Sequence, residues 1–242
     1  MFDISDKVAI VTGGRRGIGR AFVDTLSKVG VKVFVIAKSI DSAGLPDAQY
    51  LTCDLSKKEQ REGIIKEIIN DCGHIDILVN NAGFQYYEPS DIYSLDILDK
   101  SISVMVSAAL DLSQQVFPHM KKQQWGRIVN ISSLAGFQGT RNTIGYTISK
   151  HAIDGLTKCL SNEWSPFGIT VNSIAPGYIN TTMLDQLIND PERAKDMMNR
   201  IPVGRFGTPD DLVGALIFLC SNEASYITGQ SIIIDGGWRS RG

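Results

Sequence analysis

The chain reads VAIVTGGRRGIG over residues 8–19. The apolar, β-branched run Val8–Val11 passes directly into a glycine-rich turn, and residues 17–29 then follow a helical period. Glycines let the backbone turn tightly and approach a phosphate group, while the N-terminus of the next helix offers N–H groups and a positive dipole end. We therefore predict that Thr12–Gly19 holds a pyrophosphate at the first strand–helix junction of an α/β fold.

Short apolar runs alternate with longer helical segments along the whole chain, which is typical of a parallel sheet covered by helices. The expected strands are Val8–Val11, Val31–Ile36, Tyr50–Cys53, Ile75–Val79, Arg127–Ile131, Thr170–Ile174 and Ser231–Ile234, and the expected helices are Gly17–Val29, Lys57–Cys72, Leu95–Lys122, Tyr146–Trp164 and Asp210–Ser221. We predict one Rossmann-type, doubly wound α/β domain over residues 1–242, with a seven-stranded parallel sheet. The polar, Met-rich stretch 181–207 is expected to form either a substrate lid or a pair of surface helices.

The composition disfavours several classes of function. The 242 residues include 24 Lys and Arg against 26 Asp and Glu, a net charge of −2, which gives no general attraction to nucleic acid or anionic lipid. No apolar run is long enough to span a membrane, and no signal peptide is visible. The four cysteines and three histidines are dispersed and lack metal-ligand spacing. We expect a cytoplasmic protein without a metal site.

The end of the second expected strand indicates which dinucleotide would bind. NAD-binding proteins of this type carry an acid there for the ribose 2′-hydroxyl, but the strand ends in Ala37-Lys38-Ser39. Lys38, together with Arg16 in the glycine-rich turn, would suit a 2′-phosphate. We predict NADP(H) in preference to NAD(H), with two solvated surface cations as the alternative interpretation.

A second pattern concerns proton transfer. Tyr146 and Lys150 are four positions apart at the start of an expected helix, so both side chains lie on one face. A phenol has a pKa of about 10, and a neighbouring ammonium lowers it by stabilising the phenolate. Ser133 follows the strand Arg127–Ile131, at the sheet edge where ligands of such folds bind.

Together these motifs resemble the short-chain dehydrogenase/reductase family. The resemblance rests on Thr12–Gly19, Asn80–Gly83, Ser133, Tyr146 with Lys150, and Pro176-Gly177, and it extends to Asp235–Gly237. It implies that Tyr146 is the general acid/base, that Ser133 hydrogen-bonds the reacting oxygen, and that Lys150 binds the nicotinamide ribose and lowers the Tyr146 pKa. The predicted cofactor-binding residues are Thr12, Gly13, Arg15, Arg16, Gly17, Ile18, Gly19, Lys38, Asp54, Leu55, Asn81, Ala82, Gly83, Tyr146, Lys150, Pro176, Gly177, Ile179 and Thr181.

One position departs from the family pattern. The family usually has an asparagine in the long helix before the Ser133 strand, where it completes a proton relay through water to the lysine. Counting back from Gly126-Arg127, this chain has Met105 there. Methionine cannot order a water molecule through an amide, so we expect catalysis to be slower or to take its proton by another route.

Further segments resemble the gluconate-type branch of the family, which includes 2-deoxy-D-gluconate 3-dehydrogenase. They are residues 136–139, 162–164, 175–178, 200–205 and 235–238. We expect a small polyhydroxylated acid as substrate, with candidate contacts from Gln85, Gln138, Arg141 and Asn142. The alternatives are a 3-oxoacyl-(acyl carrier protein) reductase and a non-catalytic NADP(H)-binding regulator or subunit. The resemblance also implies a homotetramer or homodimer.

Overall fold

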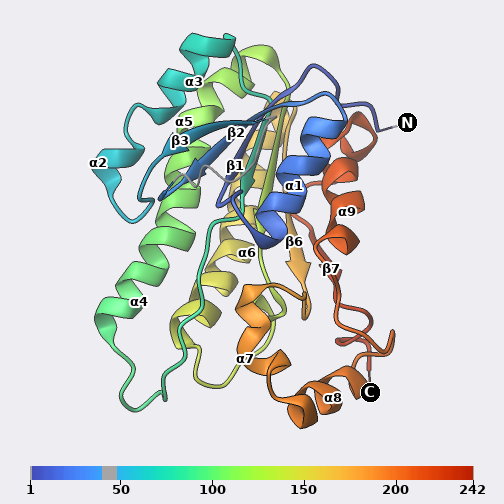
Figure 1. The fold of residues 1–242 in the computed structure, drawn as a ribbon. Coiled ribbons are helices and arrows are strands. Elements are labelled where there is room, and N and C mark those ends of the chain that lie inside the picture. Colours follow the sequence, from blue (N-terminus) through green and yellow to red (C-terminus); the bar gives the residue numbers. More distant parts are fainter. Residues whose placement is uncertain (1, 40–47, 242) are drawn as a thin grey trace.

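A seven-stranded, all-parallel sheet forms the centre of the computed structural model, which describes residues 2–39 and 48–241 (Figure 1). The strands are β1 (Val8–Thr12), β2 (Lys32–Ala37), β3 (Ala48–Thr52), β4 (Ile77–Asn80), β5 (Gly126–Ile131), β6 (Ile169–Pro176) and β7 (Ser231–Ile234). Their order is β3-β2-β1-β4-β5-β6-β7. All seven predicted strands are confirmed, and the order reverses between β1 and β4, where such folds bind their ligands.

Helices cover both faces of the sheet (Figure 1). They are α1 (Gly17–Lys28), α2 (Lys58–Arg61), α3 (Ile64–Cys72), α4 (Leu95–Ile102), α5 (Ala108–Gln123), α6 (Ile144–Trp164), α7 (Asp185–Ile188), α8 (Pro191–Asn199) and α9 (Asp210–Cys220). Successive side chains of β1 point to opposite faces, so that Val11 packs with α1 and α9 whereas Ile10 packs with α3, α5 and α6. Because both faces are covered, the central strands are apolar almost throughout.

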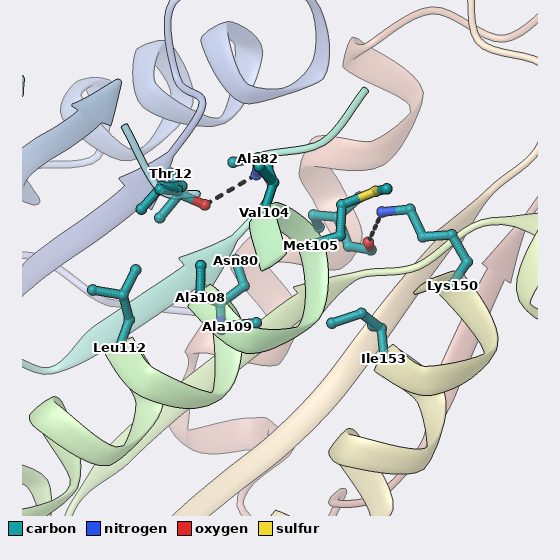
Figure 2. A pocket seen from close by; sticks show the side chains of 12 residues that line it. Thr12, Asn80, Ala82, Val104, Met105, Ala108, Ala109, Leu112, Lys150 and Ile153 are labelled. Carbon is teal, nitrogen blue, oxygen red and sulfur yellow. Dashed lines mark hydrogen bonds between the residues drawn. The ribbon is translucent and has the colours of Figure 1, made fainter. Parts of the chain in front are cut away.

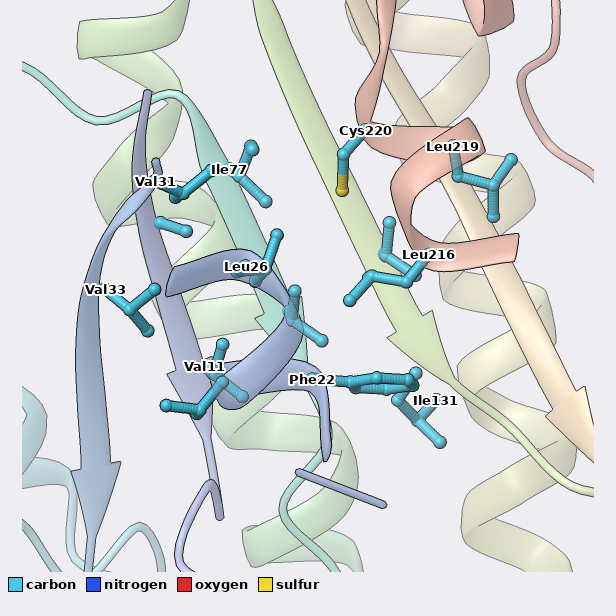
Figure 3. Close-up of a cluster of buried hydrophobic side chains, with 14 of the residues drawn as sticks. Val11, Phe22, Leu26, Val31, Val33, Ile77, Ile131, Leu216, Leu219 and Cys220 are labelled. Atoms are coloured by element: carbon cyan, nitrogen blue, oxygen red, sulfur yellow. The ribbon is translucent and has the colours of Figure 1, made fainter. Parts of the chain in front are cut away.

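The core between the sheet, α1 and α9 is closely packed. Figure 3 shows Phe22 and Leu26 of α1 facing Leu216 of α9 above Val11 and Ile131. Phe22, Leu26 and Leu216 are fully buried. This layer fixes α1, and with it the glycine-rich turn that precedes α1.

Two predicted helices differ from the observed ones. Residues 57–72 form α2 and α3 instead of one helix, because Gly63 adopts a left-handed conformation with φ of +83° between them. Residues 95–122 contain a π-helical segment, Ser103–Ser107, between α4 and α5. Such a segment inserts an extra residue into a helical turn and is frequent at functional sites. The stretch 181–207 contains the two short helices α7 and α8.

Within the described ranges 2–39 and 48–241, no helix is long and apolar enough to cross a membrane. The same ranges hold no group of three or more His, Cys, Asp or Glu side chains able to bind a metal ion.

Candidate active site

Four loops begin side by side at the carboxyl edge of the sheet. The strands β1, β4, β5 and β6 are parallel neighbours, so the segments that follow Thr12, Asn80, Ile131 and Pro176 leave the sheet at the same edge. The predicted catalytic residues and most of the predicted cofactor-binding residues lie on these segments or on the helices that follow them. The topology therefore brings together residues that are far apart in the sequence.

The glycine-rich turn after β1 has the shape of a phosphate site. Gly13 and Gly17 have φ angles of +68° and +56°, in the left-handed region that glycine adopts readily. Helix α1 begins after Arg16 with no side-chain cap and no acidic residue in its first turn. Its first N–H groups are therefore not bound by a capping side chain, and a pyrophosphate fits this helix terminus.

This turn is fixed to the loop that follows β4. The Oγ1 atom of Thr12 accepts hydrogen bonds from the backbone N–H groups of Asn81 at 2.9 Å and Ala82 at 3.0 Å. Figure 2 shows the second of these bonds. The Nδ2 atom of Asn81 donates to the carbonyl oxygens of Thr12 at 2.9 Å and Gly13 at 3.2 Å. A Cβ atom at Gly19 would lie 2.4 Å from that Nδ2 atom, so only glycine fits there.

The end of β2 carries the predicted cation Lys38, and an acid pairs with it. The Nζ atom of Lys38 lies 2.9 Å from Oδ2 of Asp54, which follows β3. The hydrogen bond from Lys38 has the largest effect on the pKa of Asp54, and together with the other hydrogen bonds it lowers this pKa to about 2. Arg15 donates a hydrogen bond to the hydroxyl of Ser39, whereas Arg16 is exposed at the start of α1. Arg15 therefore contacts the residue that follows Lys38, and the role of Arg16 at a 2′-phosphate stays a prediction.

Ser133, Tyr146 and Lys150 lie together beside the end of β5. Ser133 follows β5, and its Oγ atom accepts the N–H of Ala135 at 3.1 Å. Tyr146 and Lys150 are one turn apart near the start of α6, with Lys150 Nζ 5.3 Å from the centre of the Tyr146 ring. The same Nζ atom donates to the carbonyl oxygen of Ile131 at 2.6 Å (Figure 2).

Burial is the largest cause of the pKa shifts of Tyr146 and Lys150. It raises the pKa of Tyr146, and a hydrogen bond with Ser133 partly opposes the rise. It lowers the pKa of Lys150 to about 8, which the charge of Asp154 partly opposes. We expected Lys150 to lower the Tyr146 pKa. The net shift is upward because the phenol is desolvated, and the effect of Lys150 on this pKa stays a prediction.

Met105 lies next to the ammonium of Lys150, inside the π-helical segment. A Cβ atom placed on Gly83 would be 3.1 Å from Met105 Sδ and 3.8 Å from Lys150 Nζ, so the thioether and the ammonium approach the same point. Figure 2 shows Met105, Asn80 and Lys150 around one cavity. The volume of this cavity is about 10 Å³. This volume is close to the smallest that holds one water molecule.

Asn80 has an acceptor without a protein partner at this cavity. Its Nδ2 atom donates to Asn130 Oδ1 at 2.9 Å and reaches Ser113 Oγ at 3.4 Å. Asn130 in turn donates to Thr157 at 2.9 Å, and the Thr157 hydroxyl donates to the Ile153 carbonyl, which fixes the orientation of both amides. Among the described residues, Asn80 Oδ1 is buried and accepts no hydrogen bond.

The segment after β6 passes over the glycine-rich turn. A Cβ atom at Gly17 would lie 3.3 Å from Cγ2 of Thr181. Ile179 pairs with Gly207 in an isolated bridge, which ties the start of the 181–207 stretch to its end. A side chain on Gly177 would collide with the backbone that follows β7. The predicted nicotinamide-binding residues therefore lie on a segment that is fixed on both sides.

The four predicted substrate contacts are less closely placed. Gln85 and Gln138 are half-buried, and Arg141 and Asn142 are exposed on loops. In the part of the chain that the structure describes, none of them is hydrogen-bonded to Ser133, Tyr146 or Lys150.

Aromatic and cationic side chains that we did not predict pack together at the loop after β6. Tyr178 and Trp238 pack edge to face, with 4.8 Å between ring centres, and the Arg200 guanidinium lies 4.4 Å from the centre of the Trp238 ring. The C-terminal segment thereby joins the end of α8 to the loop after β6. Tyr178 and Trp238 lie in segments that resemble the gluconate-type branch, but the sequence did not predict their contact with the end of α8.

Arg193 of α8 and Tyr87 complete this group. Burial raises the pKa values of Tyr87 and Tyr178, and the charge of Arg193 opposes both shifts. Tyr87 in turn contributes to the raised pKa of Tyr146. Positive charge on α8 therefore acts on Tyr87, which in turn acts on Tyr146.

The chain is similar to known proteins over nearly its whole length. The family model described as enoyl-(acyl carrier protein) reductase matches residues 13–239. The 2-dehydro-3-deoxy-D-gluconate 5-dehydrogenase of Pseudoalteromonas atlantica is 38% identical over 250 residues, which cover 99% of this chain and 98% of that protein. The chain belongs to the short-chain dehydrogenase/reductase family.

Relatives within the family differ in substrate. The 3-oxoacyl-(acyl-carrier-protein) reductase of Rickettsia prowazekii is 36% identical and covers 98% of each chain. The crystal structure of a gluconate 5-dehydrogenase from Burkholderia cenocepacia, in complex with NADP and tartrate, superposes with a TM-score of 0.94 at 30% identity and covers 100% of this chain and 98% of that one. The chain is thus an NAD(P)-dependent oxidoreductase that acts on CH–OH groups, which sets aside the non-catalytic interpretation.

Proposed function

We propose that this oxidoreductase transfers hydride reversibly between NADP(H) and a ketone or secondary alcohol of a small sugar acid such as 2-keto-3-deoxygluconate. The observation that carries the proposal is the joint placement of Ser133, Tyr146 and Lys150 beside the glycine-rich turn, at one edge of the sheet. The names of the relatives from Pseudoalteromonas atlantica and Burkholderia cenocepacia support an acidic sugar as substrate.

The residues at the sheet edge fit a dinucleotide. When bound, the cofactor supplies or accepts the hydride. We assign the pyrophosphate to the turn 12–19 and the first N–H groups of α1, since the left-handed glycines and the uncapped helix suit it. The remaining assignments are the adenine to Asp54 and Leu55, the ribose side of the cleft to Asn81, Ala82, Gly83 and Lys150, and the carboxamide to Pro176, Gly177, Ile179 and Thr181.

Tyr146 holds the transferred proton at its phenol oxygen. Because burial raises its pKa, the phenol is protonated at neutral pH and can donate to the oxygen of a ketone. Ser133, which shares a hydrogen bond with Tyr146, donates to the same substrate oxygen. The ammonium of Lys150 then stabilises the phenolate that remains. In the oxidative direction, Tyr146 removes the proton from the alcohol.

Asn80 offers an acceptor for a water molecule beside Lys150. Among the residues that the structure describes, its Oδ1 atom has no protein partner, and its side chain lines the same cavity as Lys150. A water molecule there would accept from the ammonium and donate to that amide oxygen. Asn80 on β4 would thus do what the asparagine expected at position 105 does in relatives.

Two arginines on and after α8 support an acidic substrate. Arg193 and Arg200 lie on α8 and at its end, and their charges act on Tyr178. We assign the substrate carboxylate to this side, under α7 and α8 acting as a lid. Gln85, Gln138, Arg141 and Asn142 remain our candidates for contacts with the substrate hydroxyls.

Lys38 and Arg15 support the preference for NADP(H). Both reach the end of β2, where a 2′-phosphate would bind. Asp54 competes for Lys38, so a bound phosphate would take over one hydrogen bond that the carboxylate holds.

The experiment that tests the proposal follows nicotinamide absorbance with NADPH over a panel of keto sugar acids and acyl β-ketoesters, and with NADP⁺ over the matching hydroxy acids. We expect the largest kcat/KM for a keto sugar acid. The second candidate, a 3-oxoacyl-(acyl carrier protein) reductase, is supported by the relative from Rickettsia prowazekii. A larger kcat/KM for the β-ketoesters would replace the first proposal with the second.

Exposed apolar residues on α4 and α6 support the expectation of a homo-oligomer. Leu95 is 73% exposed at the start of α4, and Ile148 is 44% exposed on α6. A second copy of the chain would bury these side chains. Light scattering after gel filtration distinguishes a tetramer or dimer from a monomer, which would contradict the expectation.

A further inference from the structure

A buried carboxylate lies one helical turn beyond Lys150. Asp154 is four residues after Lys150 and eight after Tyr146, so all three are on one face of α6. Asp154 is only 5% exposed. None of the roles assigned above to the cofactor, the substrate or the transferred proton uses it.

Three serine hydroxyls surround this carboxylate. Ser132 Oγ donates to Asp154 Oδ2 at 2.7 Å, and the hydroxyls of Ser173 and Ser231 lie 2.8 Å from Oδ1. Ser132 follows β5, Ser173 lies in β6 and Ser231 begins β7. Asp154 therefore ties α6 to three neighbouring strands through side chains alone.

The bond to Ser132 acts on the backbone that carries Ser133. The N–H of Ser132 donates to the Ile174 carbonyl at 2.8 Å, and its hydroxyl donates to Asp154, so both of its donors are fixed. The chain then turns back at Gly136, where a Cβ atom would lie 2.4 Å from Asp154 Oδ2. Residues 132 and 136 therefore both lie against the Asp154 carboxylate, and Ser133 lies between them in the chain.

The charge of Asp154 also acts on Lys150. Two titratable groups face the Lys150 ammonium, namely Tyr146 and Asp154, both on α6. Asp154 raises the pKa of Lys150 against the effect of burial, and the result is about 8. Removal of the negative charge would therefore lower the Lys150 pKa further, so that the ammonium is lost at a lower pH than in wild type.

We propose that Asp154 is a positioning residue. It fixes the backbone that carries Ser133 through its bond with Ser132, and its negative charge keeps Lys150 protonated. The inference rests on the proposed function, in which Ser133 contacts substrate and Lys150 contacts cofactor. Asp154 itself would contact neither the substrate nor the cofactor.

The test measures NADPH affinity by fluorescence titration across pH, together with kcat and KM on the best substrate. Asp154→Asn removes the charge and keeps the shape. Asp76→Asn is the matched control, because Asp76 is another buried acid, 3% exposed, beside the amino end of β4. Ser231→Ala removes one hydroxyl and retains the charge.

In wild type we expect NADPH affinity to fall at alkaline pH as Lys150 loses its proton. Asp154→Asn should move that midpoint down by about half a pH unit or more and lower kcat about tenfold with little change in KM. Asp76→Asn and Ser231→Ala should keep the wild-type midpoint. A folded Asp154→Asn variant with the wild-type midpoint and kcat would overturn the proposal, as would a wild-type affinity that does not change with pH.

Failure of the proposed function and misfolding of Asp154→Asn can both be distinguished from failure of the positioning role. If wild type turns over no member of the panel, the proposed function fails, while the NADPH titration still decides the role of Asp154. If Asp154→Asn does not fold, Ser132→Ala decides the matter, since it breaks the link to β5 and leaves the charge. We then expect a lower kcat with an unchanged midpoint, and a wild-type kcat in Ser132→Ala would refute the positioning role.

Discussion

Lys150 Nζ donates to the carbonyl oxygen of Ile131 at 2.6 Å. This bond joins α6, which carries Tyr146, to the last residue of β5, two positions before Ser133. It uses one of the three protons of the ammonium, and in our proposal the other two serve the cofactor ribose and the cavity beside Asn80. The protonation state of one lysine therefore bears on the whole trio.

The pH dependence of turnover should reveal this lysine. Burial lowers the Lys150 pKa from 10.5 to about 8, so the ammonium is present below that pH and is lost above it. We expect kcat/KM for ketone reduction to fall above a midpoint of about 8. A pH series on wild type and Lys150→Arg checks this, because arginine stays charged and should lack that limb. A wild-type profile that is flat to about pH 10 would contradict the account.

Lys38 should determine the choice of cofactor. Lys38→Asp removes the cation that faces the 2′-phosphate and places a second acid next to Asp54. We expect NADPH affinity to fall about tenfold or more and NADH affinity to rise, as measured by fluorescence titration of both cofactors. Lys32→Asp is the control, since Lys32 begins β2 at the opposite end of the strand. Tighter binding of NADH than of NADPH by wild type would show that our interpretation of the cations is wrong.

Met105 should be replaceable without a gain in rate. If Asn80 holds the water molecule beside Lys150, an amide at position 105 adds little, and Met105→Asn should change kcat by less than about threefold. Met105→Phe should lower kcat, because the larger ring would enter a cavity of about 10 Å³. Steady-state kinetics on both variants checks this, with thermal unfolding as the control for stability. A rise of about tenfold or more in Met105→Asn would show that the methionine limits proton delivery.

The core under the glycine-rich turn should be sensitive to truncation. Phe22 is fully buried between α1, α9 and the sheet, and Phe22→Ala should lower the free energy of unfolding by about 3–5 kcal/mol. Tyr226→Ala is the matched control, because Tyr226 is fully exposed, and its effect should stay within about 0.5 kcal/mol. Urea denaturation measures both. Equal effects in the two variants would mean that α1 does not depend on this layer.

The fold could be predicted because its strands are short, apolar and bounded by turn residues. The glycine-rich turn after Val8–Val11 marks the first strand–helix junction. The later strands are recognisable as short apolar runs between longer segments of helical period. The break at Gly63 was not predictable with the same ease, because a glycine inside a helical pattern is often tolerated. The π-helical segment at Ser103–Ser107 left no local signal, since its residues continue the helical period.

The site was predictable where a motif carries it and not where tertiary contacts do. Tyr146, Lys150 and Ser133 have a fixed spacing and lie where their motifs indicated. The pairing of Lys38 with Asp54 joins two strand ends, and the direction of the Tyr146 shift depends on burial that spacing does not report. Asp154 was passed over for the same reason, because its serine partners come from three separate strands.

The most direct measurement is the rate of NADPH oxidation with 2-keto-3-deoxygluconate by wild type and by Tyr146→Phe. The variant lacks the phenol oxygen that holds the transferred proton and retains the ring. We expect turnover by wild type, a loss of about 100-fold or more in kcat for the variant, and NADPH affinity within about twofold of wild type. A Tyr146→Phe variant that retains the wild-type rate would contradict the assignment of Tyr146 as the acid/base.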